Sequence, residues 1–179
     1  MKYYKKDKIA WCITDGAAGN ISQVKGLASA MKLDFQLKEV KLRFPWKFLP
    51  VGYFPTFGLA IKNLDNVKDN AIPSYIITAG RKSIYSSLYL KNKFKNKVKT
   101  IHIQDPKINP KLFDCVVAPE HDSINGQNVI KTKLAINHIN DQLLFSEAKK
   151  FQEKLSFLKK PIVTVILGGK NKNYYFDKS

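Results

Sequence analysis

Residues 9–28, IAWCITDGAAGNISQVKGLA, decide the fold class of this chain. The stretch opens with five apolar residues, 9–13, a length and composition typical of a short buried strand. Two breaks follow, at Asp15-Gly16 and at Gly19-Asn20. A helical pattern then begins, so the stretch predicts a strand, a glycine loop and a helix.

The helix is predicted by apolar residues that recur at 3.6-residue spacing. They are Ile21, Val24, Leu27, Ala28 and Met31. Asn20 or Ser22 is the expected N-cap. Such a unit places backbone N–H groups and a positive helix end at the carboxyl edge of a strand, where α/β sheets bind ligands.

The loop residues are therefore candidates for binding a substrate or an anion: Asp15, Gly16, Gly19 and Asn20. The alternative is that the two glycines simply make a tight turn. The spacing matches neither the dinucleotide fingerprint nor the P-loop, so we predict no cofactor.

A second unit of the same kind follows the predicted strand at residues 75–79. Gly80 and Arg81 come next, and a helix continues through Ile84 and Leu88. A cation beside a helix start would favour an anion further, which makes Gly80 and Arg81 candidate anion-binding residues. A plain turn with exposed cations is the alternative.

Further strands are predicted at residues 36–42, 98–103, 113–119, 128–132 and 161–167, and a long helix at 141–159. Strands that alternate with helices predict an α/β fold with a Rossmann-like, mainly parallel, doubly wound sheet. Polar residues follow two of these strands, at 104–106 and 120–122, and we expect both groups at the same edge.

His121 is the best acid–base candidate, because imidazole titrates near neutrality and Glu120 and Asp122 flank it. We predict His121 and Asp122 as catalytic residues. The alternative is a solvated loop in which His121 bonds a backbone carbonyl. Three adjacent residues cannot all face one ion, so no metal site is predicted. His102 is expected to pack in the core, and His138 has no evident partner.

The formal net charge of +17 suggests a polyanion or an acidic membrane surface as partner. The alternative is that the lysines form a solvated surface. No motif for specific nucleic-acid recognition is present. Residues 44–59 contain six aromatic residues and three prolines. They either fold back on the core or form an exposed patch for a membrane or a lipid-linked substrate, with Trp46, Phe48 and Phe54 docking.

Cys12 and Cys115 lie in apolar runs and are expected to be buried thiols, as in a reducing compartment. No signal peptide or membrane-spanning run is evident. We therefore expect a cytoplasmic protein, with peripheral association at the inner face of the membrane.

Several separated blocks carry a resemblance to a known family. They include Thr14-Asp15-Gly16, Gly26-Leu27-Ala28, Gly80-Arg81, the segment 119–122, and the strand at 161–167 with Gly168-Gly169. Together these blocks resemble the N-terminal half of the mitochondrial fission protein family, typified by the plant elongated-mitochondria protein and its bacterial relatives.

The resemblance implies a two-domain, glycosyltransferase-B-like fold with a cleft between the domains. Residues 1–160 would form the acceptor-type domain, and 161–179 the first strand of a truncated donor domain. Sugar would pass from a nucleotide-sugar to a membrane-associated acceptor, with Gly16, Gly19, Arg81 and His121 facing the cleft and Gly168 and Gly169 contributing anion contacts. The 179 residues alone would then be inactive. The alternative class is a non-catalytic, basic, membrane-peripheral interaction protein.

Overall fold

The computed structural model describes residues 9–44, 48 and 72–165. Its six strands are β1 Ile9–Thr14, β2 Asp34–Glu39, β3 Tyr75–Ala79, β4 Lys99–Ile103, β5 Cys115–Pro119 and β6 Val129–Thr132. The helices are α1 Ala18–Ala30, α2 Ser83–Phe94 and α3 Asp141–Lys154, with short 3₁₀ turns at Lys95–Lys97 and Pro110–Leu112.

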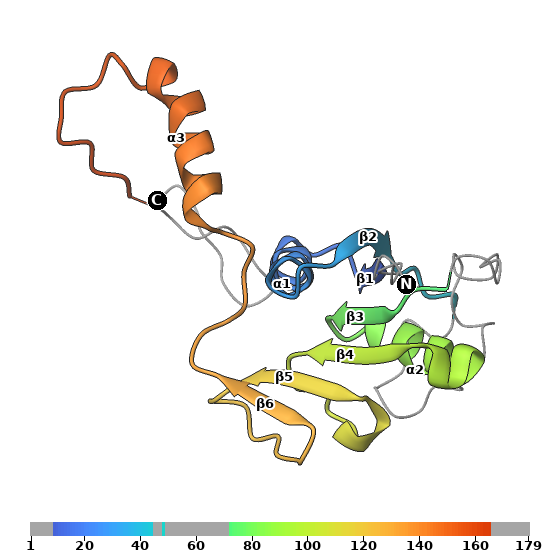
Figure 1. Cartoon of the computed structure of the whole chain (residues 1–179). Coiled ribbons are helices and arrows are strands. Elements are labelled where there is room, and N and C mark those ends of the chain that lie inside the picture. The colour runs from blue at the N-terminus through green and yellow to red at the C-terminus, as the bar shows by residue number, and fades with distance from the viewer. Residues whose placement is uncertain (1–8, 45–47, 49–71, 166–179) are drawn as a thin grey trace, which may run out of the picture. The chain divides into compact units, whose positions relative to one another are not determined.

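All six strands join one parallel sheet in the order β2-β1-β3-β4-β5-β6, which Figure 1 shows strand by strand. Strands β2 and β3 flank β1 on opposite sides. The order in which the chain adds strands to the sheet therefore reverses between β2 and β3. Open α/β sheets bind ligands at such a switch point, outside the carboxyl ends of the strands.

Helices cover both faces of the central strands. Val24 and Ala28 of α1 pack in one apolar cluster with Cys12 of β1. Residues of α2 pack with Trp11, the neighbouring residue of the same strand, in another cluster. Because successive side chains of a strand point to opposite faces, α1 and α2 lie on opposite sides of the sheet. The predicted α/β, doubly wound, Rossmann-like fold is confirmed.

The start of α1 differs from the prediction. The helix begins at Ala18, and its N-cap, Ala17, provides no capping side chain. Asn20 and Ser22 therefore lie inside the first turns, and their side chains bond Asp15 and His138 instead of capping the helix. Tertiary partners have replaced the local cap that the sequence suggested.

Other boundaries shift by a few residues. Strand β2 begins at Asp34 and ends at Glu39, and α3 ends at Lys154. Cys12 is fully buried, as expected, and burial raises its pKa to about 12. Cys115 is half-buried.

The chain separates into two compact units, Met1–His138 and Ile139–Ser179. In the second unit, the segment after α3 is described to residue 165, and it forms no strand there. Val163 and Val165 are 81% and 76% exposed. The predicted buried strand at 161–167 is therefore wrong for its described part, because no described strand pairs with it. The assignment of 161–179 to a second domain stays a prediction.

Among the described residues, no helix combines the length and the apolar character needed to cross a bilayer.

Candidate functional site

The loops that follow β1 and β3 touch at the carboxyl edge of the sheet. Gly80 has φ +88°, and a Cβ atom placed there would lie 2.4 Å from Asn20 Nδ2. Gly16 has φ +87°, and a Cβ there would lie 3.2 Å from the carboxyl carbon of Glu39. Both positions need glycine for backbone conformation, and Gly80 needs it for space as well.

A chain of side-chain amides joins these loops to β4. Asn20 donates to Asp15 Oδ1 at 2.8 Å, and Gln104 Nε2 donates to Asn20 Oδ1 at 3.2 Å and to Gln23 Oε1 at 3.0 Å. Gln104 has φ +81°, an uncommon conformation for a residue other than glycine. Its backbone N–H is held by the carbonyl of Val117 at 2.8 Å. Strained residues of this kind concentrate at functional sites.

A cavity of about 590 Å³ opens beside this network. Its lining comes from the ends of β3 and β4, the start of α2 and one aromatic residue from the segment before β3. The lining residues are Phe48, Gly80, Arg81, Ile84, His102, Gln104, Asp105, Pro106 and Lys107. Three predicted site residues line it: Gly80 and Arg81, expected to bind an anion, and Phe48, expected to dock at a membrane. Neither α1 nor α2 begins with a side-chain cap.

The loops after β4 and β5 are tied together by charged residues. Asp105 pairs with Lys107 at 2.7 Å, and its backbone N–H donates to Asp122 Oδ2 at 3.3 Å. Lys131 donates to the backbone carbonyl of Asp122. Burial raises the pKa of Asp105, but hydrogen bonds and charge from Lys107, with the charge of Lys131, outweigh it and hold the pKa below its ordinary value. Asp105 is therefore ionised at neutral pH.

His102 is buried, as expected, but it also borders the cavity. Its Nδ1 lies 2.8 Å from Thr78 Oγ1, and its ring stacks on Phe113 with 5.2 Å between the ring centres. Burial lowers its pKa to about 3, although Asp105 opposes the shift. The imidazole is neutral at physiological pH.

The predicted catalytic pair, His121 and Asp122, does not belong to the cavity lining. The side chain of His121 is 80% exposed, its Nε2 lies 4.0 Å from Asp122 Oδ1, and it does not line the cavity. The carboxylate of Asp122 instead accepts a hydrogen bond from the backbone N–H of Asp105, in the loop after β4. The acid–base role of His121 and Asp122 stays a prediction.

Other predicted residues have simpler positions. Gly19 lies in the first turn of α1, and no atom lies within 4 Å of a Cβ placed there. Phe48 is 71% exposed. Gly168, Gly169, Trp46 and Phe54 lie outside the described residues.

His138 has a partner that the sequence did not reveal. Ser22 Oγ lies 2.7 Å from His138 Nδ1, and Gly26 lets the backbone of Asn137 lie directly against α1. The interpretation of His138 as unpartnered was wrong, because Ser22 is 116 residues away in sequence.

Sequence reasoning did not select four of the nine described lining residues as site residues: His102, Gln104, Asp105 and Lys107. The sequence feature that could have indicated Gln104 and Asp105 as site residues is their position directly after a predicted strand. No group of three or more His, Cys, Asp or Glu side chains within the described part of the chain is arranged to hold a metal ion.

A parallel, doubly wound sheet with a cavity at its carboxyl edge defines the class: a Rossmann-like α/β domain. A family model described as Mitochondrial fission ELM1 matches residues 18–179. The chain belongs to this family.

The uncharacterized protein RP120 of Rickettsia prowazekii (strain Madrid E) is 28% identical over 200 residues, covering 94% of this chain and 56% of RP120. The chain thus spans about half the length of this curated relative. No solved structure matches.

Proposed function

We propose that this chain is the acceptor-side part of a glycosyltransferase-like protein, and that the cavity beside Arg81 binds an anionic, phosphate-bearing group of a substrate. The sugar would come from a nucleotide-sugar donor held by a further domain. The acceptor would be membrane-associated.

The observation that carries this proposal is that the two glycine loops touch each other, and that one of them lines a cavity with Gly80 and Arg81. Arg81 directly follows Gly80 at the start of α2, where the helix dipole favours negative charge. Guanidinium groups bind phosphate through two parallel hydrogen bonds, which makes Arg81 the best anion ligand in the lining.

The test is to measure binding of a panel of nucleotide sugars and of inorganic phosphate to the full-length protein by calorimetry. Arg81→Ala should weaken phosphate-dependent binding by about 10-fold, the loss expected for one charged hydrogen-bonding group. Lys82→Ala is the matched control, because it removes the neighbouring positive charge from a residue outside the cavity lining. Equal weakening by both variants would leave only a general effect of charge and would refute a site at Arg81.

A second candidate is supported by a separate observation. Phe44 and Phe48 are 78% and 71% exposed, and their rings form an edge-to-face pair with centres 6.4 Å apart. With a net charge of +17, an exposed aromatic pair also fits a membrane-peripheral interaction protein.

A further inference from the structure

A lysine-rich segment connects the end of α2 to the start of β4. Lysine occupies every second position of this segment, which gives the five residues called here the lysine cluster: Lys91, Lys93, Lys95, Lys97 and Lys99. Residues 82–104 contain no aspartate or glutamate. Because the segment leads into β4, it lies at the amino edge of the sheet, and no cluster residue lines the cavity at Arg81.

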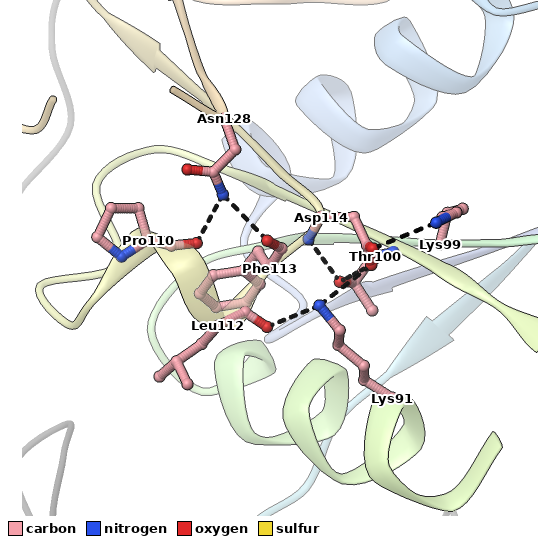
Figure 2. Close-up of polar contacts among 8 residues, drawn as sticks. All are labelled: Lys91, Lys99, Thr100, Pro110, Leu112, Phe113, Asp114 and Asn128. Atoms are coloured by element: carbon pink, nitrogen blue, oxygen red, sulfur yellow. Dashed lines mark hydrogen bonds and ion pairs between the residues drawn. The ribbon is translucent and has the colours of Figure 1, made fainter. Parts of the chain in front are cut away.

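Aspartate 114 offsets a part of this positive charge. Asp114 Oδ2 lies 3.2 Å from Lys91 Nζ, and its Oδ1 lies 3.5 Å from Lys99 Nζ (Figure 2). Within the part of the chain that the structure describes, Lys93, Lys95 and Lys97 form no ion pair, and all three are exposed. The cluster therefore keeps most of its positive charge at the surface.

The lysines border two adjoining hollows. One hollow, of about 550 Å³, is lined by Lys91, Lys95 and Lys99 among others. The other, of about 510 Å³, is lined by Lys93, Lys95 and Lys97 among others. Lys95 lines both. A concave surface lined by charges of one sign focuses the electric field and concentrates anions there.

The residue shared by the two hollows has a costly backbone conformation. Lys95 is the C-cap of α2 and has φ +48°, in the region that favours glycine. Its backbone N–H donates to the carbonyl of Lys91, so the turn that ends the helix fixes this conformation. Strained positions of this kind concentrate at functional sites, which favours a binding role over a merely solvated surface.

The chemistry of the cluster favours lipid headgroups over nucleic acid. The cluster contains no arginine, whose planar fork recognises a phosphate in a fixed geometry. Phe94, the aromatic residue of the segment, is 4% exposed and packs edge-to-face on Trp11, so it offers no face on which a base can stack. Clusters of roughly four to eight basic residues are typical of attraction to anionic lipid.

We propose that the lysine cluster docks the protein on an anionic phospholipid surface, with lipid headgroups entering the two hollows. This inference rests on the membrane association in the proposed function, and it assigns the electrostatic part of that association to these residues. The amino edge of the sheet is then the edge that meets the lipid.

The first test is flotation of the full chain with vesicles of phosphatidylserine and phosphatidylcholine. The triple variant Lys93→Gln, Lys95→Gln and Lys97→Gln should bind about 100-fold more weakly, since each lysine close to anionic lipid is worth about a 5-fold change in affinity.

A second triple variant is the matched control, because it removes the same charge from exposed lysines outside the cluster: Lys32→Gln, Lys133→Gln and Lys159→Gln. It should weaken binding by less than about 5-fold, because charges farther from the lipid than a Debye length are screened. Equal losses in the two triple variants would show an effect of net charge alone and would refute the docking surface.

The second test needs no variant. Acetylation of the wild-type chain with a water-soluble reagent should slow at Lys93, Lys95 and Lys97 when phosphatidylserine vesicles are added, while Lys133 and Lys159 keep their reactivity. Cluster lysines that react equally fast with and without vesicles would overturn the proposal.

The remaining outcomes separate this inference from the proposed function. Wild-type protein that does not float with anionic vesicles refutes both the docking surface and membrane association. Binding to polyuridylate that requires the cluster, without binding to vesicles, makes nucleic acid the partner and overturns the lipid assignment. The cavity at Arg81 is tested by calorimetry with soluble ligands, so it stands or fails independently of these results.

Discussion

At the residue scale, Asp114 joins three parts of the fold through one carboxylate (Figure 2). Its Oδ2 accepts from the backbone N–H and the hydroxyl of Thr100 at 2.9 and 2.8 Å, and lies 3.2 Å from Lys91 Nζ. Lys91 also donates to the carbonyl of Leu112 at 3.1 Å, while Lys99 is a longer contact at 3.5 Å. Asp114 thereby ties α2 and β4 to the start of β5.

The same contacts make Asp114 a source of pH-dependent stability. Burial raises its pKa, but hydrogen bonds from Thr100 and Lys91 outweigh burial and lower the pKa below the ordinary value of 3.8. Because the folded pKa is the lower one, the contribution is fully present above 3.8 and is lost as the pH falls through the folded value.

We expect Asp114→Asn to lower the free energy of unfolding by about 1–2 kcal/mol at pH 7, since it weakens hydrogen bonds made to a charged group. The difference from wild type should shrink at a pH well below 3.8, because the stabilising charge is lost as the carboxylate is protonated. Urea unfolding at both pH values measures this. Lys99→Ala is the control, and its effect should stay within about 0.5 kcal/mol because the Lys99 side chain is 65% exposed. An equal Asp114→Asn effect at both pH values would contradict the role of the charge.

At the element scale, α1 is fixed by close approach of backbone to backbone. A Cβ on Gly26 would lie 2.2 Å from the carbonyl oxygen of Asn137 and 3.0 Å from the nitrogen of His138. One helical turn earlier, Ser22 bonds His138. Residues 137 and 138 therefore lie along α1, and glycine is what allows this contact.

Gly26→Ala should destabilise the fold by about 1–3 kcal/mol, because the backbone of Asn137 must move to accept a methyl group. Helix propensity alone predicts the opposite sign, a gain of about 1 kcal/mol. Gly19→Ala in the same helix is the matched control, since nothing lies within 4 Å of its Cβ position, and it should be neutral or stabilising. Thermal unfolding of both variants decides the sign, and a stabilised Gly26→Ala would disprove the packing argument.

At the scale of the whole molecule, net charge and exposed aromatic rings act together. The formal net charge is +17, and near anionic lipid each basic residue contributes about 1 kcal/mol. Phe44 and Phe48 add apolar surface that is exposed in the folded protein. Membrane binding that depends on both the positive charge and the aromatic rings must weaken when salt is raised and when the rings are removed.

We expect flotation with vesicles containing phosphatidylserine, and less flotation as salt is raised. The double variant Phe44→Ser and Phe48→Ser should bind about 10-fold more weakly, because each ring would bury apolar surface in the interface. Vesicles of phosphatidylcholine alone are the control for charge. Unchanged binding by the double variant would exclude the aromatic pair as a membrane contact.

Local patterns in the sequence were enough to predict most of the strands and helices and the class of fold. The sequence predicted the strand at Tyr75–Ala79 with the bounds that the structure has, and the spacing of apolar residues predicted the start of the helix at Asp141. These features depend on residues only a few positions apart, so they can be predicted from the sequence alone. The glycines at 16 and 80 were also visible, because a break between a strand and a helix requires a residue that tolerates positive φ.

Which side chains share a site depends on contacts between residues far apart in the sequence. Gln104 bonds Asn20 across 84 positions, Ser22 bonds His138 across 116, and Thr78 hydrogen-bonds His102 from the neighbouring strand. None of these pairs leaves a local pattern. The order of strands in the sheet brings them together, and the burial of His102 at the cavity wall follows from that packing. The sequence could not show this, because a core position and a cavity-wall position look the same in a short apolar strand.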